Sequence, residues 1–409
     1  MAAASRARSS SSAALALLLL LLLQQQQKGA AFEAPAHEAI SMTALSGLTM
    51  QANQALRRLL NGKDVADVSG WAHRVTEKYP LTAPLHFQRQ QTCPSPPPTA
   101  ANTEIQRSLC SSSSAAADGC LLEALTYFFY RLTAPEKNQE PRDPADPVIR
   151  TDKFVFPHGI ETTDADAVKY VINLIGDMHE PLHWGSSEDD FGRTIFVEYE
   201  AGDGTREKQR SSLYEFIEGA FIKKIMGERQ TFWYSGWTHV NSVKSFYEEE
   251  KTVFAARKET YFLSWARENR ALLCAEIYPL LSRMTKKKDE PNVYVLDRTS
   301  EFLFFEIIKK RILVAGARTA VVMNHILQVR GLDEGLGQLR AGSGIQDVQE
   351  TADARPPAAG ESYLAFRRCI STDSNLVQPL LSTYQTPAAA AAAAGTAAAA
   401  LAAVAEQQQ

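Results

Sequence analysis

The sequence predicts an all-α protein with one small extended segment, and three observations lead to this. Apolar residues recur at intervals of three and four along most of residues 36–330. Strand-like alternation is confined to Thr194–Tyr199, where it is short and isolated. Hydrophobic residues make up 45% of the chain, which is ordinary for a globular protein. The net charge is −4, so the protein as a whole has no excess of positive charge to attract nucleic acid. Any polyanion therefore has to be bound locally.

The first 31 residues are typical of a secretory signal peptide. Arg6 and Arg8 precede the apolar run Ala13–Leu23, and Gly29 and Ala31 are small residues suited to cleavage. The run is about eleven residues long, whereas a membrane span needs about twenty, so an uncleaved anchor is the weaker alternative. Cleavage after Ala31 makes Phe32 the mature N-terminus and leaves no membrane span. We expect the protein in the secretory pathway, either secreted or in a secretory or lytic organelle.

Helical spacing continues from residue 36 to residue 330 in six regions. In the first region the recurring apolar residues are Ile40, Leu45, Leu48, Leu56, Leu59 and Leu60. The regions are 36–92, Leu121–Leu132, Ala165–Asp177, Leu213–Met226, Val243–Met284 with a break, and Ser300–Val329. Together they predict one helical domain over residues 32–331.

Two segments lack this spacing. Residues 93–117 contain Pro-Ser-Pro-Pro-Pro and a Ser/Ala tract, which predicts a long exposed loop inserted in the domain. Residues 332–409 are rich in Gly, Pro and Ala and end in Ala tracts and glutamines, which predicts a disordered tail without a second catalytic domain. The extended segment near 194–200 is expected to form a small hairpin.

Histidine is the most informative residue type in this chain. The five cysteines contain no Cys-x-x-Cys pair, which argues against a thiolate zinc finger. Several of the eight histidines lie in apolar, motif-like settings, among them His37, His73, His86 and His183. Zinc sites in helical proteins combine such histidines with carboxylates on facing helices, although each histidine taken singly is better explained as a hydrogen-bonded core residue or a solvated one. Asp177 and His183 flank a helix end at Pro181, so both can point into one cleft.

The run Gly176-Asp177-Met178-His179-Glu180-Pro181-Leu182-His183 resembles the GDxHQPLH signature of the zinc-dependent single-strand nucleases of the S1/P1 type, the class I nucleases. Other elements follow in that family's order and extend the resemblance over about residues 32–330. They are His37, Trp71-Ala72-His73, Pro84-Leu85-His86-Phe87, Asp118-Gly119-Cys120, Trp265-Ala266-Arg267-Glu268 with Cys274, and Ala315–Ala320 with Asn324.

The resemblance implies a phospholipase C/nuclease-type helical fold and up to three zinc ions. Phe32 would bind through main-chain atoms and Asp177 would contact two ions. His73 replaces an Asp, while Asn173 and Tyr214 stand at His positions, where an amide or a phenol is a weaker ligand for zinc. The implied ligands are Phe32, His37, His73, His86, Asn173, Asp177, His183, Tyr214 and Glu218.

The implied activity is that of a secreted zinc endonuclease that cuts single-stranded DNA or RNA to 5′-phosphate products. Asp177 would be its central catalytic residue and Phe87 would stack a base, although an ordinary core Phe is the alternative for Phe87. The resemblance also implies the disulfides Cys93–Cys274 and Cys110–Cys120, with Cys369 left over. Nucleic acid or nucleotide is the expected partner, with no obligate protein partner evident.

Two alternative functions remain open. Asn173 and Tyr214 replace histidines of the family, and Arg89 stands where the family keeps an acid. These three substitutions favour a metal-depleted binding protein on the same fold. A related zinc phosphoesterase of the phospholipase C type is the other alternative.

Overall fold

A computed structural model describes residues 34–110, 112, 114–133, 156, 160–201, 207–228, 240–256, 260–331 and 345. All of them belong to the first of two compact units, residues 1–352. The predicted signal peptide, Phe32 and nearly all of the predicted tail lie outside the described residues. The domain boundaries at 31 and 331 therefore stay predictions.

The first helical region is a series of short helices. These are α2 (Ala34–Gly47), α3 (Met50–Leu59), α4 (Trp71–Lys78) and the 3₁₀ helix η1 (Pro80–His86). Thr49 caps α3 by accepting a hydrogen bond from the Ala52 amide at 3.1 Å. The prediction of helix as far as residue 92 is wrong beyond His86. The chain there becomes extended because Gln88 pairs with Gly119 and Gln90 pairs with Ser186.

The predicted helices at 121–132 and 165–177 are confirmed. They are α6 (Leu121–Thr133) and α7 (Asp164–Met178), and a single turn, α5 (Ala115–Asp118), precedes α6. A reciprocal capping box begins α7, since Thr163 and Asp166 each accept a hydrogen bond from the other's backbone amide. After α7 the chain turns at Pro181 into the short 3₁₀ helix η3 (Pro181–Trp184).

The next two predicted regions each contain a wide turn of π-helix. The first comprises α8 (Leu213–Glu215), π-helix η4 (Phe216–Ala220) and α9 (Phe221–Glu228). The second comprises α11 (Val240–Ala256), α12 (Tyr261–Leu272), π-helix η5 (Leu273–Ile277) and α13 (Tyr278–Arg283). Single π turns inside α-helices are frequent at functional sites because they change the direction of the side chains. Here they carry Glu218 and Cys274.

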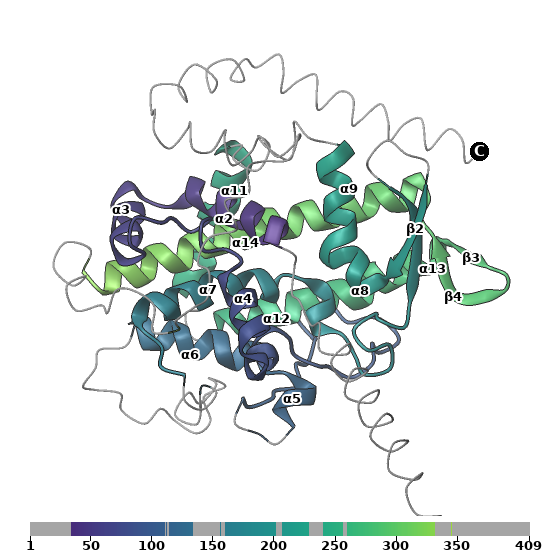
Figure 1. Ribbon diagram of the computed structural model, residues 1–409, viewed down its shortest axis with the longest axis horizontal. Coiled ribbons are helices and arrows are strands. Elements are labelled where there is room, and N and C mark those ends of the chain that lie inside the picture. The colour runs from purple at the N-terminus through teal and green to yellow at the C-terminus, as the bar shows by residue number, and fades with distance from the viewer. Residues whose placement is uncertain are drawn as a thin grey trace, which may run out of the picture. The chain divides into compact units, whose positions relative to one another are not determined.

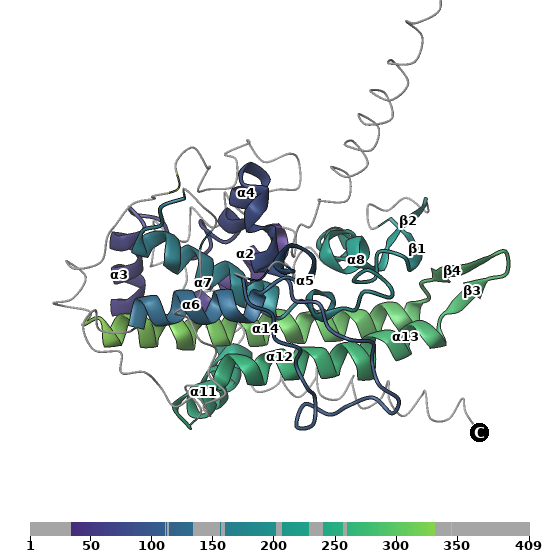
Figure 2. The ribbon, with the colours of Figure 1, turned by 90° about the horizontal axis from the view of Figure 1, so that it is seen from below.

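The longest helix, α14 (Arg298–Val329), is the centre of the described unit (Figure 1). It packs against α2 and α11, and Figure 2 shows α12 and α13 running beside it. Gly316 makes the contact with α2 close, because an added Cβ would lie 2.4 Å from the Thr43 side chain. α14 is long and apolar enough to span a membrane. However, 72% of its most apolar segment is buried inside the protein, as in the central helix of a folded domain.

The extended segment is part of a larger sheet than the sequence predicts. β1 (Phe196–Glu200) and β2 (Lys208–Ser212) form the expected antiparallel hairpin. A second hairpin of β3 (Thr285–Lys287) and β4 (Glu290–Val295) completes a four-stranded sheet of order β2-β1-β4-β3, in which β4 is parallel to β1. The predicted hairpin is therefore confirmed, and the second hairpin beside it is the part that the sequence did not predict. The second hairpin is short and half-exposed, so its alternation is weak, and it is stabilised by the pairing of Val293 in β4 with the distant Phe196 in β1.

Two apolar clusters make up the core of the described residues. One joins α6, α7, α12 and the second half of α14 around Phe128, Tyr170 and Trp265. The other joins the sheet, α8, α9 and the first half of α14 around Phe216, Phe221 and Phe304. Both expected disulfides are present, with S–S distances of 2.04 Å for Cys93–Cys274 and 2.05 Å for Cys110–Cys120.

Candidate metal centre

Four of the predicted ligands meet around the carboxylate of Asp177. His37 comes from α2, His73 from α4, His86 from the end of η1, and Asp177 from the last turn of α7. Asp177 Oδ1 lies 3.2 Å from His37 Nε2 and 3.4 Å from His73 Nε2, and Oδ2 lies 2.7 Å from His86 Nδ1. Four segments that are far apart in the sequence thus converge on one buried carboxylate, which we call the Asp177 cluster.

Gly176 makes room for this arrangement. An ideal Cβ on Gly176 would lie 2.5 Å from two ring atoms of His37, a distance that side-chain atoms do not tolerate. The imidazole of His37 therefore lies directly against the backbone of α7, beside Asp177. The glycine of the motif is explained by this close approach.

The spacing of the Asp177 cluster fits a zinc ion. In a tetrahedral site with ligand distances of about 2.0–2.1 Å, two ligand atoms are about 3.3 Å apart. Asp177 Oδ1 has this separation from both His37 Nε2 and His73 Nε2. His37, His73 and Asp177 also form one of the groups whose ligand atoms all lie within 4.8 Å of one another.

The protonation states also suit a cation. Burial lowers the pKa of His73 to about 3, although nearby Asp177 opposes this, so at neutral pH its ring is uncharged and keeps a lone pair. Burial would raise the pKa of Asp177, but the neighbouring His86 and His73 imidazoles hold it well below its usual range. The cluster therefore presents an ionised carboxylate beside a neutral imidazole.

His86 and Asn173 have more constrained positions. His86 uses both ring nitrogens in hydrogen bonds, Nδ1 to Asp177 Oδ2 at 2.7 Å and Nε2 to Thr76 Oγ1 at 3.0 Å. Asn173 donates its amide hydrogens to the carbonyls of Lys169 and Val68 at 2.8 and 3.1 Å. Its Oδ1 is buried without a hydrogen bond among the described residues. Asn173 precedes Asp177 by one helical turn, so this oxygen lies on the same face of α7.

The remaining predicted ligands form a second group, the His183 cluster. His183 Nε2 lies 2.8 Å from Glu218 Oε1 and 3.8 Å from Glu180 Oε2, and these three side chains are at most 4% exposed. Burial and the nearby Glu218 raise the pKa of Glu180 to about 7, although His183 opposes this. Glu180 is not predicted as a ligand from the sequence, yet it is the third member of this group.

Tyr214 lies beside the His183 cluster as a neutral phenol. Its ring is stacked on that of His183, with centroids 6.3 Å apart, and the Arg193 guanidinium lies 3.7 Å above it. Burial and the nearby Glu218 raise its pKa well above the usual value, which Arg193 only partly offsets. An un-ionised phenol is a poor zinc ligand.

The extended segment after His86 connects the two clusters. The Gln88 amide donates to the His183 carbonyl at 2.9 Å and the Gln90 amide donates to the Gly185 carbonyl at 2.8 Å. Buried Arg270 of α12 donates to the carbonyls of Trp184 and Gln91. These hydrogen bonds hold the segment after His86 against the segment after His183.

A family model described as S1/P1 nuclease matches residues 34–328. The chain belongs to the S1/P1 nuclease family. This family membership supports a nuclease, and more generally a hydrolase, and it agrees with the mostly helical fold. A comparison with curated proteins finds no match.

His179 of the nuclease signature has a structural position. It is fully buried, its Nδ1 donates to the Ile175 carbonyl at 2.7 Å, and its Nε2 accepts from the Arg318 guanidinium at 2.8 Å. Arg318 in turn forms ion pairs with Glu268 and Glu250 at 2.5 and 2.8 Å. This network attaches the end of α7, and so Asp177, to α12 and α14. It also explains why a histidine in an apolar setting need not be a ligand.

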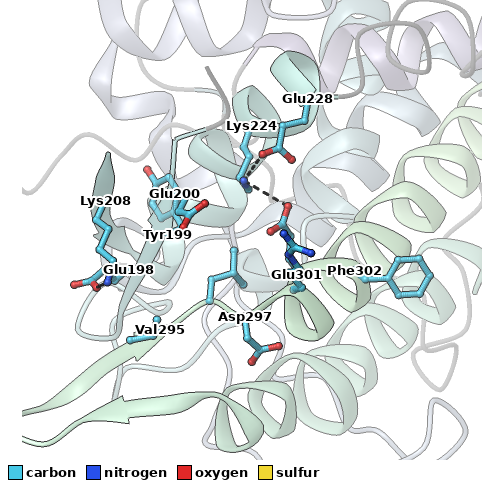
Figure 3. Close-up of a pocket in the computed structure, with 12 residues that line it drawn as sticks. Glu198, Tyr199, Glu200, Lys208, Lys224, Glu228, Val295, Asp297, Glu301 and Phe302 are labelled. Atoms are coloured by element: carbon cyan, nitrogen blue, oxygen red, sulfur yellow. Dashed lines mark hydrogen bonds and ion pairs between the residues drawn. The ribbon is translucent and has the colours of Figure 1, made fainter. Parts of the chain in front are cut away.

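A cavity of about 600 Å³ lies elsewhere, beside the sheet and the start of α14 (Figure 3). Lys224 from α9 points into it and pairs with Glu228 and Glu301. None of the predicted ligands lines this cavity. Its lining has five carboxylates and three basic side chains, and this net negative charge does not suit a polyanion.

Proposed function

We propose that the protein is a zinc-dependent endonuclease that hydrolyses phosphodiester bonds of single-stranded DNA or RNA and leaves 5′-phosphate products. One observation carries this proposal: the ionised carboxylate of Asp177 is surrounded by His37, His73 and His86 at 2.7–3.4 Å. A buried carboxylate with this many imidazoles, of which His73 is neutral, is a ligand set for zinc. Membership of the S1/P1 nuclease family supports the same reading.

His37, His73 and Asp177 would hold one zinc ion, and His183 with Glu218 would contribute to a second. His86, Asn173 and the main chain of Phe32 stay proposed ligands of the first region. Bound zinc supplies activation of a water molecule near neutral pH and charge stabilisation for a phosphate group. Of the protein's own groups, His86 orients Asp177 through its Nδ1 hydrogen bond, and Thr76 in turn orients His86.

Substrate binding is proposed for the residues beside the second cluster. Phe87 is half-buried and packs edge-to-face on Phe191, with ring centroids 5.2 Å apart. The Arg89 and Arg193 guanidinium groups lie 4.8 and 5.7 Å from the Phe191 ring. Phe191 is only 3% exposed, so Phe87 is the ring of this pair that can stack on a base, and the neighbouring arginines suit the phosphates without a sequence requirement.

A metal-depleted binding protein is the second candidate, favoured by the un-ionised Tyr214 under Arg193. In that case Arg89, Arg193 and Phe87 would still bind nucleic acid. Both candidates suit a secreted protein, because the two disulfides form in an oxidising compartment. A phospholipase C-type phosphoesterase has no structural observation in its favour over a nuclease.

The test compares the purified protein with Asp177→Asn, a substitution that keeps the volume of the side chain. We expect zinc-loaded wild type to cleave single-stranded DNA, chelator to abolish cleavage, and the variant to lose at least about a hundredfold in rate, or ~2.7 kcal/mol. Asp289→Asn changes the same residue type in an exposed turn of the second hairpin and should leave the rate unchanged. N-terminal sequencing of the secreted protein tests the predicted start at Phe32.

Two results would count against a zinc nuclease. If zinc-loaded wild type binds single-stranded DNA but cleaves neither DNA nor RNA, the binding-protein alternative is correct. If Asp177→Asn cleaves as fast as wild type, the Asp177 cluster is not the site of the chemistry.

A further inference from the structure

In the His183 cluster, only one carboxylate oxygen of Glu180 accepts a hydrogen bond from the described residues. Glu180 is fully buried and its Oε2 accepts a hydrogen bond from the His183 amide at 2.6 Å. Its Oε1 is buried too, and no hydrogen bond reaches it from the described residues. His183 is also the only basic side chain among them within ion-pairing distance of Glu180, at 3.8 Å. One oxygen of a buried carboxylate is thus left for another electropositive group.

Local structure directs Glu180 toward His183 and Glu218. Glu180 is the N-cap of η3, and His183 follows it by three residues, so in a 3₁₀ turn the two side chains lie on the same side. Glu218 approaches from the π-helical turn η4, with Oε1 2.8 Å from His183 Nε2. One oxygen or nitrogen from each residue lies within 4.8 Å of the other two.

The charges of this cluster call for a cation. When both carboxylates are ionised, they and the one imidazole carry a net negative charge in a site where all three residues are at least 97% buried. Burying like charges this close together is strongly unfavourable unless a positive charge lies among them. A protonated His183 would offset only one of the two carboxylates, whereas a divalent cation would offset both.

We propose that Glu180, His183 and Glu218 form a divalent-cation site in which Glu180, and not Tyr214, is the third protein ligand. This inference rests on the proposed function, because it assumes that both clusters bind metal. It changes the expected ligands of the His183 cluster. Tyr214 then covers the site with its ring, stacked on His183 and held by Arg193.

The ligand set also predicts which ion the site takes. Two carboxylates and one imidazole are harder ligands than the three imidazoles and one carboxylate of the Asp177 cluster. Carboxylates favour Mn²⁺ and Mg²⁺, whereas imidazoles favour Zn²⁺. We therefore expect Mn²⁺ to bind at the Glu180 site in preference to the Asp177 cluster, although zinc can occupy both.

The test is a Mn²⁺ titration of the metal-free full-length protein followed by electron paramagnetic resonance, with zinc content measured in parallel. Wild type should bind Mn²⁺ at the Glu180 site, and Glu180→Gln should weaken that binding at least about tenfold while zinc at the Asp177 cluster is retained. Gln keeps the oxygen that accepts the His183 amide, so the fold is preserved. Thermal unfolding of the metal-free variant checks this.

Three comparisons make the assignment specific. Glu188→Gln, an exposed residue of the same loop, should leave Mn²⁺ binding unchanged. Tyr214→Phe should also leave it unchanged, because the phenol is not a ligand. His73→Gln should reduce zinc content without affecting Mn²⁺.

The opposite pattern would overturn the proposal. If Tyr214→Phe abolishes Mn²⁺ or zinc binding at this cluster while Glu180→Gln does not, Tyr214 is the ligand. If wild type binds no Mn²⁺ and Glu180→Gln leaves zinc content unchanged, Glu180 holds no metal. Nuclease activity is measured separately. If the protein cleaves nucleic acid but shows either of these binding patterns, only the ligand assignment is refuted. If metal binding depends on Glu180 but no nucleic acid is cleaved, only the proposed nuclease function is refuted.

Discussion

His73→Gln tests whether the Asp177 cluster holds a neutral imidazole. The folded protein keeps the pKa of His73 at about 3, against 6.5 for an unperturbed histidine, mainly because the ring is buried. The unfolded chain therefore takes up a proton as pH falls below about 6.5, whereas the folded protein does not until about pH 3. By linkage, acid favours the unfolded state in this range, and the effect is complete below pH 3.

The magnitude follows from the two pKa values. Between pH 7 and pH 4.5 the difference in proton binding costs about 2.5 kcal/mol of unfolding free energy. The His73 side chain is 15% exposed, so solvent screening makes this an upper value. Glu180 acts in the opposite direction, because its pKa is raised to about 7 in the folded protein and its protonation stabilises the fold as pH falls. Only a comparison with a variant that retains Glu180 separates the two.

The assay is urea denaturation of metal-free protein with intact disulfides at pH 7 and pH 4.5, for wild type and His73→Gln. Gln keeps a hydrogen-bond donor near Asp177 but cannot titrate. We expect wild type to lose up to about 2.5 kcal/mol more than the variant on acidification. If both lose the same, burial does not lower the pKa of His73 and the prediction is wrong. If wild type gains relative to the variant, His73 is protonated beside Asp177 at neutral pH. Its lone pair would then be unavailable to a metal.

Three further perturbations test the framework around the site. Gly176→Ala places a Cβ 2.5 Å from the His37 ring and should displace it, lowering zinc content by atomic emission; unchanged zinc content would mean that His37 is not a ligand. Arg318→Met removes the guanidinium shared by Glu268 and Glu250 and should cost about 3–5 kcal/mol in urea denaturation, and a cost below about 1 kcal/mol would show that the network matters little. Cys274→Ser opens a bridge between residues 181 apart and should cost about 2–5 kcal/mol, seen as a lower Tm by calorimetry, whereas an equal Tm would contradict a stabilising role.

The helices of the described unit were predictable because their residues repeat with the helical period. Leu121–Leu132 and Ser300–Val329 were expected and are observed as α6 and α14 with their ends shifted by one or two residues. The expected break between Val243 and Met284 lies between α11 and α12. Local apolar spacing is sufficient for such helices, since each one buries a single stripe of its own residues.

The composition of the Asp177 cluster was also accessible from the sequence, through the order of its motifs. His37, His73, His86 and Asp177 were all expected at one site, and the structure places them around one carboxylate. The same is true of the pair Cys93 and Cys274. This information came from the resemblance to the S1/P1 nucleases, which places the motifs together, and not from a local property of any one motif.

Only the tertiary structure decided the rest. The pairing of β1 with β4 joins residues such as Phe196 and Val293, which are far apart in the sequence, and no local pattern in either strand specifies its partner. The role proposed for Glu180 depends on a buried oxygen without a donor and on the approach of Glu218 from a π-helical turn. The uncharged state of His73 depends on burial by distant segments. Charge state and missing partners are properties of a residue's surroundings, and those surroundings exist only once the chain has folded.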